Sequence, residues 1–96
     1  MLKGLNEFVK EANSEIKKEN RKLNMLHREI DEYETLIYVV GQTGSKDQIM
    51  YYKQKINKCY AKIDLCLENI SSNKDRIATM KAINKIIKRS EKSAWK

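Results

Sequence analysis

Apolar residues recur every seven positions through most of this 96-residue chain, and this repeat constrains the fold more than any other feature. Counted from Leu2, every seventh residue up to Ile37 is Leu, Val or Ile. A second series, from Ile49 to Ile77, is isoleucine throughout. A mostly apolar position follows three residues after each member, as the a and d positions of a coiled coil do. Each half sustains six heptads, which is more than the roughly three or four that indicate a coiled coil.

The segment between the two series predicts a tight turn. Gly41 suits the left-handed conformation that ends many helices, and Ser45 with Gln48 forms a capping-box pattern that begins the next helix. A loop this short makes the two helices antiparallel neighbours. We therefore predict an all-α fold, an antiparallel coiled-coil helical hairpin. Its single domain comprises a helix at 2–40, a turn at 41–47, a helix at 48–90 and a frayed basic tail at 91–96.

The heptads also predict how the two helices pair. A register in which paired residue numbers sum to 89 sets a against d, so that Leu26 meets Ile63 and Ile30 meets Cys59. The flanking positions then bring opposite charges together, which sets orientation and partner choice more than stability. The expected pairs are Glu34 with Lys53, Glu29 with Lys62, and Glu15 with Arg76.

Three polar residues, Glu19, Asn73 and Asn84, interrupt the apolar seam. A polar group at a core position costs stability unless it is paired, and a lone core Asn often fixes the register. We favour this register role over the alternative, in which Glu19 and Asn73 contact a partner or a second subunit. The polar run 71–73 raises the alternative of a kink, although the unbroken isoleucine series favours one continuous helix.

The net positive charge of the chain is confined to its second half. The chain has 20 Lys and Arg against 13 Asp and Glu, a net charge of +7. Residues 1–40 carry a net charge of −1 and residues 49–96 a net charge of +8. Such a segment favours a polyanionic partner or an acidic protein surface. The alternative is a solvated helix from a proteome rich in Lys, Asn and Ile.

Residues that would carry catalysis or bind a cofactor are nearly absent. Cys59 and Cys66 are seven residues apart, which on a helix is ~10 Å and beyond disulfide reach. We interpret them as reduced, buried thiols, without the ligand cluster of a metal site. His27 is the only histidine, and no catalytic pair accompanies it. We expect no enzyme activity, no cofactor and no small-molecule substrate.

No apolar run is long enough for a signal peptide or a membrane span. With the reduced cysteines, this predicts a cytoplasmic protein without membrane contact. Many apolar residues nevertheless fall outside a and d, so we expect self-association into a helical bundle as a homodimer or higher homo-oligomer. These residues are Leu36, Tyr38, Val39, Met50, Tyr51, Tyr60, Leu65, Leu67 and Ile86.

One predicted interaction surface lies beside the turn. It consists of four residues at outer b and c positions with two tyrosines beneath them, and we call it the tip cluster: Tyr38, Val39, Met50, Tyr51, Tyr33 and Tyr52. Exposed aromatic residues clustered with Met are typical of protein interfaces. Contact with another protein and contact with a second copy remain equal alternatives.

The other predicted surface lies near the chain ends, where b and e positions of both helices share one side. It carries no carboxylate, and three asparagines (Asn6, Asn13 and Asn20) accompany its lysines. We call it the lysine face: Lys3, Lys10, Lys17, Lys74, Lys81, Lys85, Lys88 and Lys92. Lysines and asparagines in this pattern suit a phosphate backbone, with weak sequence specificity. The alternative is a solvated face.

These features predict a small interaction protein. The size, the Lys, Asn and Ile bias and the missing catalytic residues are typical of accessory proteins of low-GC bacteria and their phages. We therefore expect a phage or mobile-element adaptor or inhibitor that binds another protein. The alternatives are a nucleic-acid-binding protein that uses the lysine face, and a virion or scaffold component.

Overall fold

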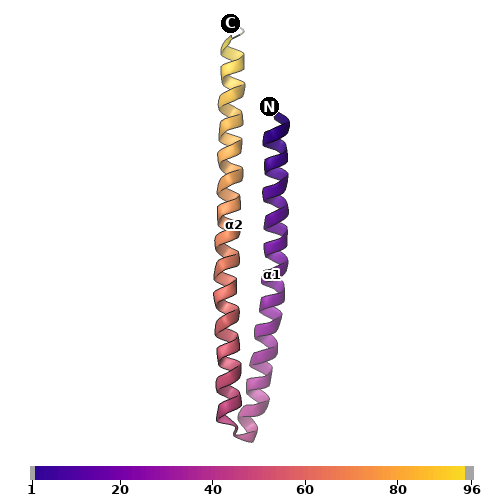
Figure 1. Cartoon of the computed structure of the whole chain (residues 1–96), viewed down its shortest axis with the longest axis vertical. Coiled ribbons are helices and arrows are strands. Elements are labelled where there is room, and N and C mark those ends of the chain that lie inside the picture. The colour runs from indigo at the N-terminus through magenta and orange to yellow at the C-terminus, as the bar shows by residue number, and fades with distance from the viewer. Residues whose placement is uncertain (1, 95–96) are drawn as a thin grey trace.

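The computed structural model describes residues 2–94, with side chains from 4 to 91, as two long helices folded back on each other (Figure 1). Helix α1 spans Leu2–Thr43 and helix α2 spans Lys46–Ala94. The molecule measures 79 × 14 × 13 Å. The all-α antiparallel hairpin expected from the heptads is therefore confirmed.

Helix continues through almost every described residue because little in the sequence interrupts it. The chain has no proline and three glycines, and proline and glycine are the residues least favourable in a helix interior. Helix α2 passes without a break through 71–73. It also continues through 91–94, where we expected fraying, because no helix-breaking residue precedes Ala94. Residues 95 and 96 lie outside the described part.

The turn is shorter than predicted, and a different glycine makes it. Gly41 lies inside α1, and Gly44 adopts the left-handed conformation with φ = 86°. The Gly44 N–H donates to the Val40 carbonyl oxygen at 3.1 Å, which is the bond of an αL helix end. Helix α2 begins at Lys46 instead of 48, since the Ser45 carbonyl accepts its first bond, from the Ile49 N–H at 3.3 Å. The predicted turn at 41–47 is thus wrong at both ends.

The core is a narrow strip at the middle of the hairpin. It joins buried residues to partly buried neighbours that pack against them: Leu23, Leu26, Ile30, Tyr33, Ile56, Cys59, Ile63 and Cys66. These eight residues form four successive pairs whose numbers sum to 89, so the cluster agrees with the predicted register. Ile70 and Ala12 extend the buried residues toward the chain ends, but other seam residues at both ends are only half-buried, as at Val9 near the chain ends and Val40 beside the turn. Two helices alone therefore bury their seam continuously only in the middle.

The predicted ion pairs between helices do not form. In the described part of the chain, the salt bridges are Lys18 with Glu15 at 3.6 Å and Lys22 with Glu19 at 3.3 Å, both within α1. Glu34 with Lys53, Glu29 with Lys62 and Glu15 with Arg76 are therefore wrong as ion pairs. The members of these pairs are exposed, and exposed charges gain little from one fixed geometry. A lysine and a glutamate three residues apart on the same helix lie next to each other, so they form an ion pair more easily.

The polar residues of the seam differ in their burial and in whether their side chains have hydrogen-bond partners. Asn73 Nδ2 donates to the Asn69 carbonyl at 2.9 Å and thus bonds within its own helix. Asn84 has a buried Oδ1 that lacks a hydrogen-bond partner among the described residues. Glu19 is only 5% exposed and is the one buried charged residue of the described side chains.

Candidate interaction surfaces

The tip cluster is held together by stacked tyrosines. The Tyr33 and Tyr52 rings, one from each helix, lie 5.9 Å apart between centroids. The Tyr51 ring meets Tyr52 edge to face at 5.7 Å, and Lys55 Nζ lies 5.3 Å from the Tyr51 centroid. Aromatic pairs at these distances attract beyond their buried area, and the ammonium adds a cation–π contact. The base of the tip is therefore ordered by its own side chains.

The outer members of the tip cluster are open to solvent. Tyr38 is 72% exposed and Met50 is 61% exposed, whereas Tyr33 and Tyr52 are half-buried. Val39 and Tyr51 are also exposed. The structure thus places all six residues at one end of the rod, as expected, with four of them uncovered. Lys55 was missed, although its spacing of four from Tyr51 on one helix was a usable signal.

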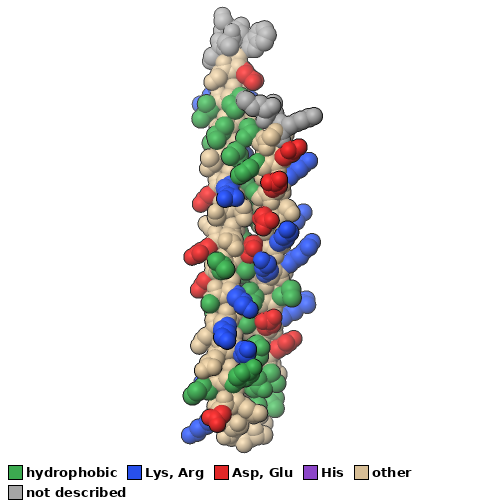
Figure 2. Space-filling model, in the orientation of Figure 1, with side chains coloured by type: hydrophobic (Ala, Val, Ile, Leu, Met, Phe, Trp, Pro, Cys, Tyr) green, Lys and Arg blue, Asp and Glu red, His purple; other side chains and the backbone are tan. Residues whose placement is uncertain are grey.

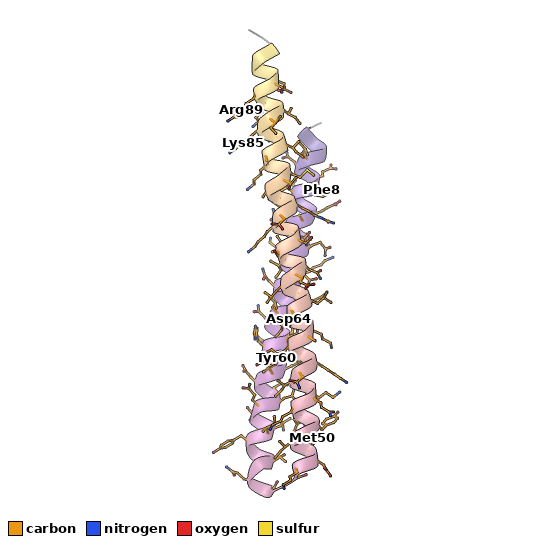
Figure 3. All side chains as sticks on the ribbon, turned by 90° about the vertical axis from the view of Figure 1, so that its left-hand side faces the viewer. Phe8, Met50, Tyr60, Asp64, Lys85 and Arg89 are labelled. Carbon is orange, nitrogen blue, oxygen red and sulfur yellow. The ribbon has the colours of Figure 1, made fainter. Side chains whose placement is uncertain are left out.

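The lysine face is solvated where the structure describes it. Its described lysines are all exposed, and none lies within ion-pair distance of a described carboxylate: Lys10, Lys17, Lys74, Lys81, Lys85 and Lys88. The side chains of Lys3 and Lys92 lie outside the described residues. Figure 3 shows Lys85 pointing to the same side of the rod as Tyr60, with Phe8 on the opposite side.

Two buried thiols lie against carboxylates of α1, an arrangement that the sequence analysis missed. Cys59 Sγ donates to Glu29 Oε2 at 3.5 Å, and Cys66 lines the same groove as Glu19, whose carboxylate acts on the pKa of the Cys66 thiol. Both cysteines are free and buried, as expected. Burial, and then the neighbouring carboxylate, raise the pKa of both thiols. The thiols therefore stay protonated at neutral pH, where the thiolate would be the reactive form.

Glu19 is the centre of the buried polar layer. The hydrogen bond from Cys66 lowers the pKa of its carboxyl, desolvation opposes this, and the ammonium of Lys22 adds to the lowering. The register in which paired numbers sum to 89 places Glu19 opposite Ile70, whose apolar side chain offers no donor. Cys66, one helical turn before Ile70 on α2, was the available signal for a thiol partner. Its two partners let the carboxylate stay ionised inside the seam.

Two further features limit the kinds of site. Neither helix, within residues 2–94, contains an apolar stretch that would cross a membrane. Among the described side chains, no three His, Cys, Asp or Glu residues gather as a metal site would require.

Together the fold and its surfaces define an antiparallel coiled-coil hairpin with an aromatic tip and a lysine-covered flank. Comparisons of the chain with protein-family models, curated proteins and solved structures find no match in any of the three.

Proposed function

We propose that the protein is a non-enzymatic adaptor or inhibitor of the phage or mobile-element type, and that it binds another protein through its tip cluster. The observation that carries this proposal is the exposure of Tyr38 and Met50 above an ordered tyrosine base. Tyrosine and methionine are enriched at protein interfaces, and an ordered base lowers the entropy lost on binding.

The test is affinity capture from cells that express the protein, with and without nuclease. We expect the wild type to retain a protein partner after nuclease treatment. The double variant Tyr38→Ser, Met50→Ser should lose it, because both anchors of the tip are removed. Tyr60→Ser is the matched control, since Tyr60 is an exposed tyrosine (49%) far from the turn.

Two outcomes would overturn the proposal. Retention of the partner by the double variant would remove the tip from the interaction. Loss of all captured protein after nuclease treatment would show that nucleic acid links it to the hairpin.

A second candidate function is nucleic-acid binding with weak sequence specificity. It is supported by the lysine face, whose described lysines are exposed and unpaired with described carboxylates. A mobility-shift assay at ~50 mM salt should detect binding that weakens as salt rises. Lys81→Glu, Lys85→Glu and Lys88→Glu together should abolish it, and Lys46→Glu, beside the turn, should not. Absence of binding at that salt concentration removes this candidate.

A further inference from the structure

The two flanks of the hairpin differ in apolar exposure. We call the side that carries the c and g positions the Leu65 flank and the side that carries b and e the Leu67 flank. Seven of the eleven exposed large apolar side chains lie on the Leu65 flank: Met25, Leu36, Val39, Tyr51, Leu65, Ile83 and Ile86. Two grooves run along this flank and are lined by both helices, one at Met25 and Leu65 and one at Phe8 and Arg76.

The hairpin exposes more surface than a compact chain of its mass. Its accessible surface is 7908 Å², whereas a globular monomer of 11.3 kDa exposes about 5,700 Å². The difference exceeds the about 800 Å² that each partner contributes to a stable interface. No described side chain is fully buried. The area is therefore sufficient for a second hairpin to cover one flank.

Charges on the Leu65 flank differ between the helices. Helix α1 carries four acidic residues and two lysines there, whereas α2 carries four basic residues and no acidic one: Glu11, Glu15, Glu29 and Glu32 with Lys18 and Lys22 on α1, and Lys55, Lys58, Lys62 and Arg76 on α2. Figure 2 looks onto this flank, the side to which Phe8 points in Figure 3. It shows acidic and basic side chains intermixed along α1, and basic and apolar side chains along α2 with acidic ones at its outer edge.

We propose that a second copy of the chain covers the Leu65 flank in a parallel two-fold dimer, with both tips at the same end. In this arrangement α1 of one copy lies against α2 of the other at the same height. Met25 then meets Leu65 of the second copy, and Glu29 and Glu32 meet its Lys62 and Lys58. Apolar contacts supply the affinity, and the charges select the orientation.

The charges disfavour the other arrangements. If the second copy ran in the opposite direction on the same flank, α2 would face α2, and the basic residues of the two copies would approach each other with no acidic residue of α2 between them. On the Leu67 flank, a parallel copy would set one lysine face against the other. An antiparallel copy there would set α2 against α2, whose b and e positions carry seven lysines and one aspartate. Like charges placed opposite each other in an interface cost several kcal/mol, so the parallel dimer on the Leu65 flank remains.

Solution mass tests the interface with a matched pair of leucines. Leu65 is 58% exposed and Leu67 is 51% exposed, two residues apart on opposite flanks. We expect the wild type to have twice the 11.3 kDa chain mass. Leu65→Glu should halve that mass, and Leu67→Glu should not change it. Helicity measured by circular dichroism should be the same in all three, because both side chains are exposed.

A spin label on Gln42→Cys tests the orientation. Gln42 is exposed beside the turn, so the parallel dimer predicts a short distance between labels. An antiparallel dimer would separate them by about 60 Å, the length of forty helical residues. The native thiols are buried and protonated, so the added cysteine is labelled first.

A monomeric wild type, dissociation by Leu67→Glu instead of Leu65→Glu, or the long label distance would each overturn this proposal. The two tip residues changed in the capture test, Tyr38 and Met50, lie at b positions on the Leu67 flank, whereas Val39 and Tyr51 of the tip cluster lie on the Leu65 flank. A variant that loses partner capture but keeps its dimer mass separates the two proposals.

Discussion

Glu19 shows how a two-helix seam accommodates a charge. It is 5% exposed at a position that heptads reserve for apolar residues. The Cys66 thiol and the Lys22 ammonium both interact with its carboxylate and lower its pKa. A buried carboxylate without such partners would have its pKa raised and would be neutralised.

Glu19 makes the stability of the hairpin sensitive to acid. Its carboxyl pKa is lowered in the folded state, so the unfolded chain takes up the proton first as pH falls. The free energy of unfolding should therefore decrease below about pH 4.3, the usual carboxyl value. In Glu19→Gln this component of the decrease should be absent. Urea unfolding between about pH 6 and pH 3 measures it.

Glu68→Gln is the matched control, because Glu68 is an exposed glutamate on α2. Its free energy of unfolding should depend on pH as in the wild type. If Glu19→Gln keeps it too, the carboxylate of Glu19 does not stabilise the folded state.

Asn84 is a residue at which stability can be gained. Its Oδ1 is buried without a hydrogen-bond partner in the described residues, and such a group costs about 1–3 kcal/mol. Asn84→Leu restores an apolar a position and should raise the free energy of unfolding by about 1 kcal/mol or more. Urea titration at neutral pH measures the change. A decrease would instead support the register role of this asparagine.

At the scale of the elements, the end of α1 depends on one backbone conformation. Gly44 has φ = 86°, while Gly41 is helical. Apart from the neighbouring backbone, neither position has an atom within 4 Å of where a Cβ would lie, so packing against the rest of the hairpin does not forbid a methyl group at either. Only their backbone conformations distinguish them.

The two glycines should therefore respond oppositely to alanine. Gly44→Ala should destabilise the hairpin by about 1–2 kcal/mol, because a left-handed residue brings Cβ close to the next carbonyl. Gly41→Ala should stabilise it by about 0.5–1 kcal/mol, because alanine is the better helix former. Thermal unfolding of the two variants measures both shifts. Equal signs would contradict the assignment of the turn.

The heptad repeat predicted the features that follow from its periodicity. Helix, antiparallel pairing and the pairing of Leu26 with Ile63 all follow from seven-residue spacing. The repeat did not distinguish Gly41 from Gly44, since either can take positive φ and the choice depends on how the last turn of α1 closes. It also did not find the contact of Glu19 with Cys66. Heptads predict which residues face the seam, and the rotamers that join a thiol to a carboxylate are not encoded in them.

For the whole molecule, the proposed dimer makes stability depend on association. In a parallel dimer, folding and association are linked, so the apparent stability depends on protein concentration. The midpoint of thermal unfolding should rise with concentration for the wild type and for Leu67→Glu. For Leu65→Glu it should be lower and constant. Melting curves recorded over a hundredfold concentration range test this, and a constant midpoint for the wild type would contradict the dimer.

The length of the rod has a consequence for its ligands. The molecule is 79 Å long, whereas charges in physiological salt are screened over about 8 Å. If the tip cluster binds a protein and the lysine face binds a polyanion, as proposed above, the charges of the two ligands are too far apart to interact. The two proposed ligands would then bind without electrostatic competition.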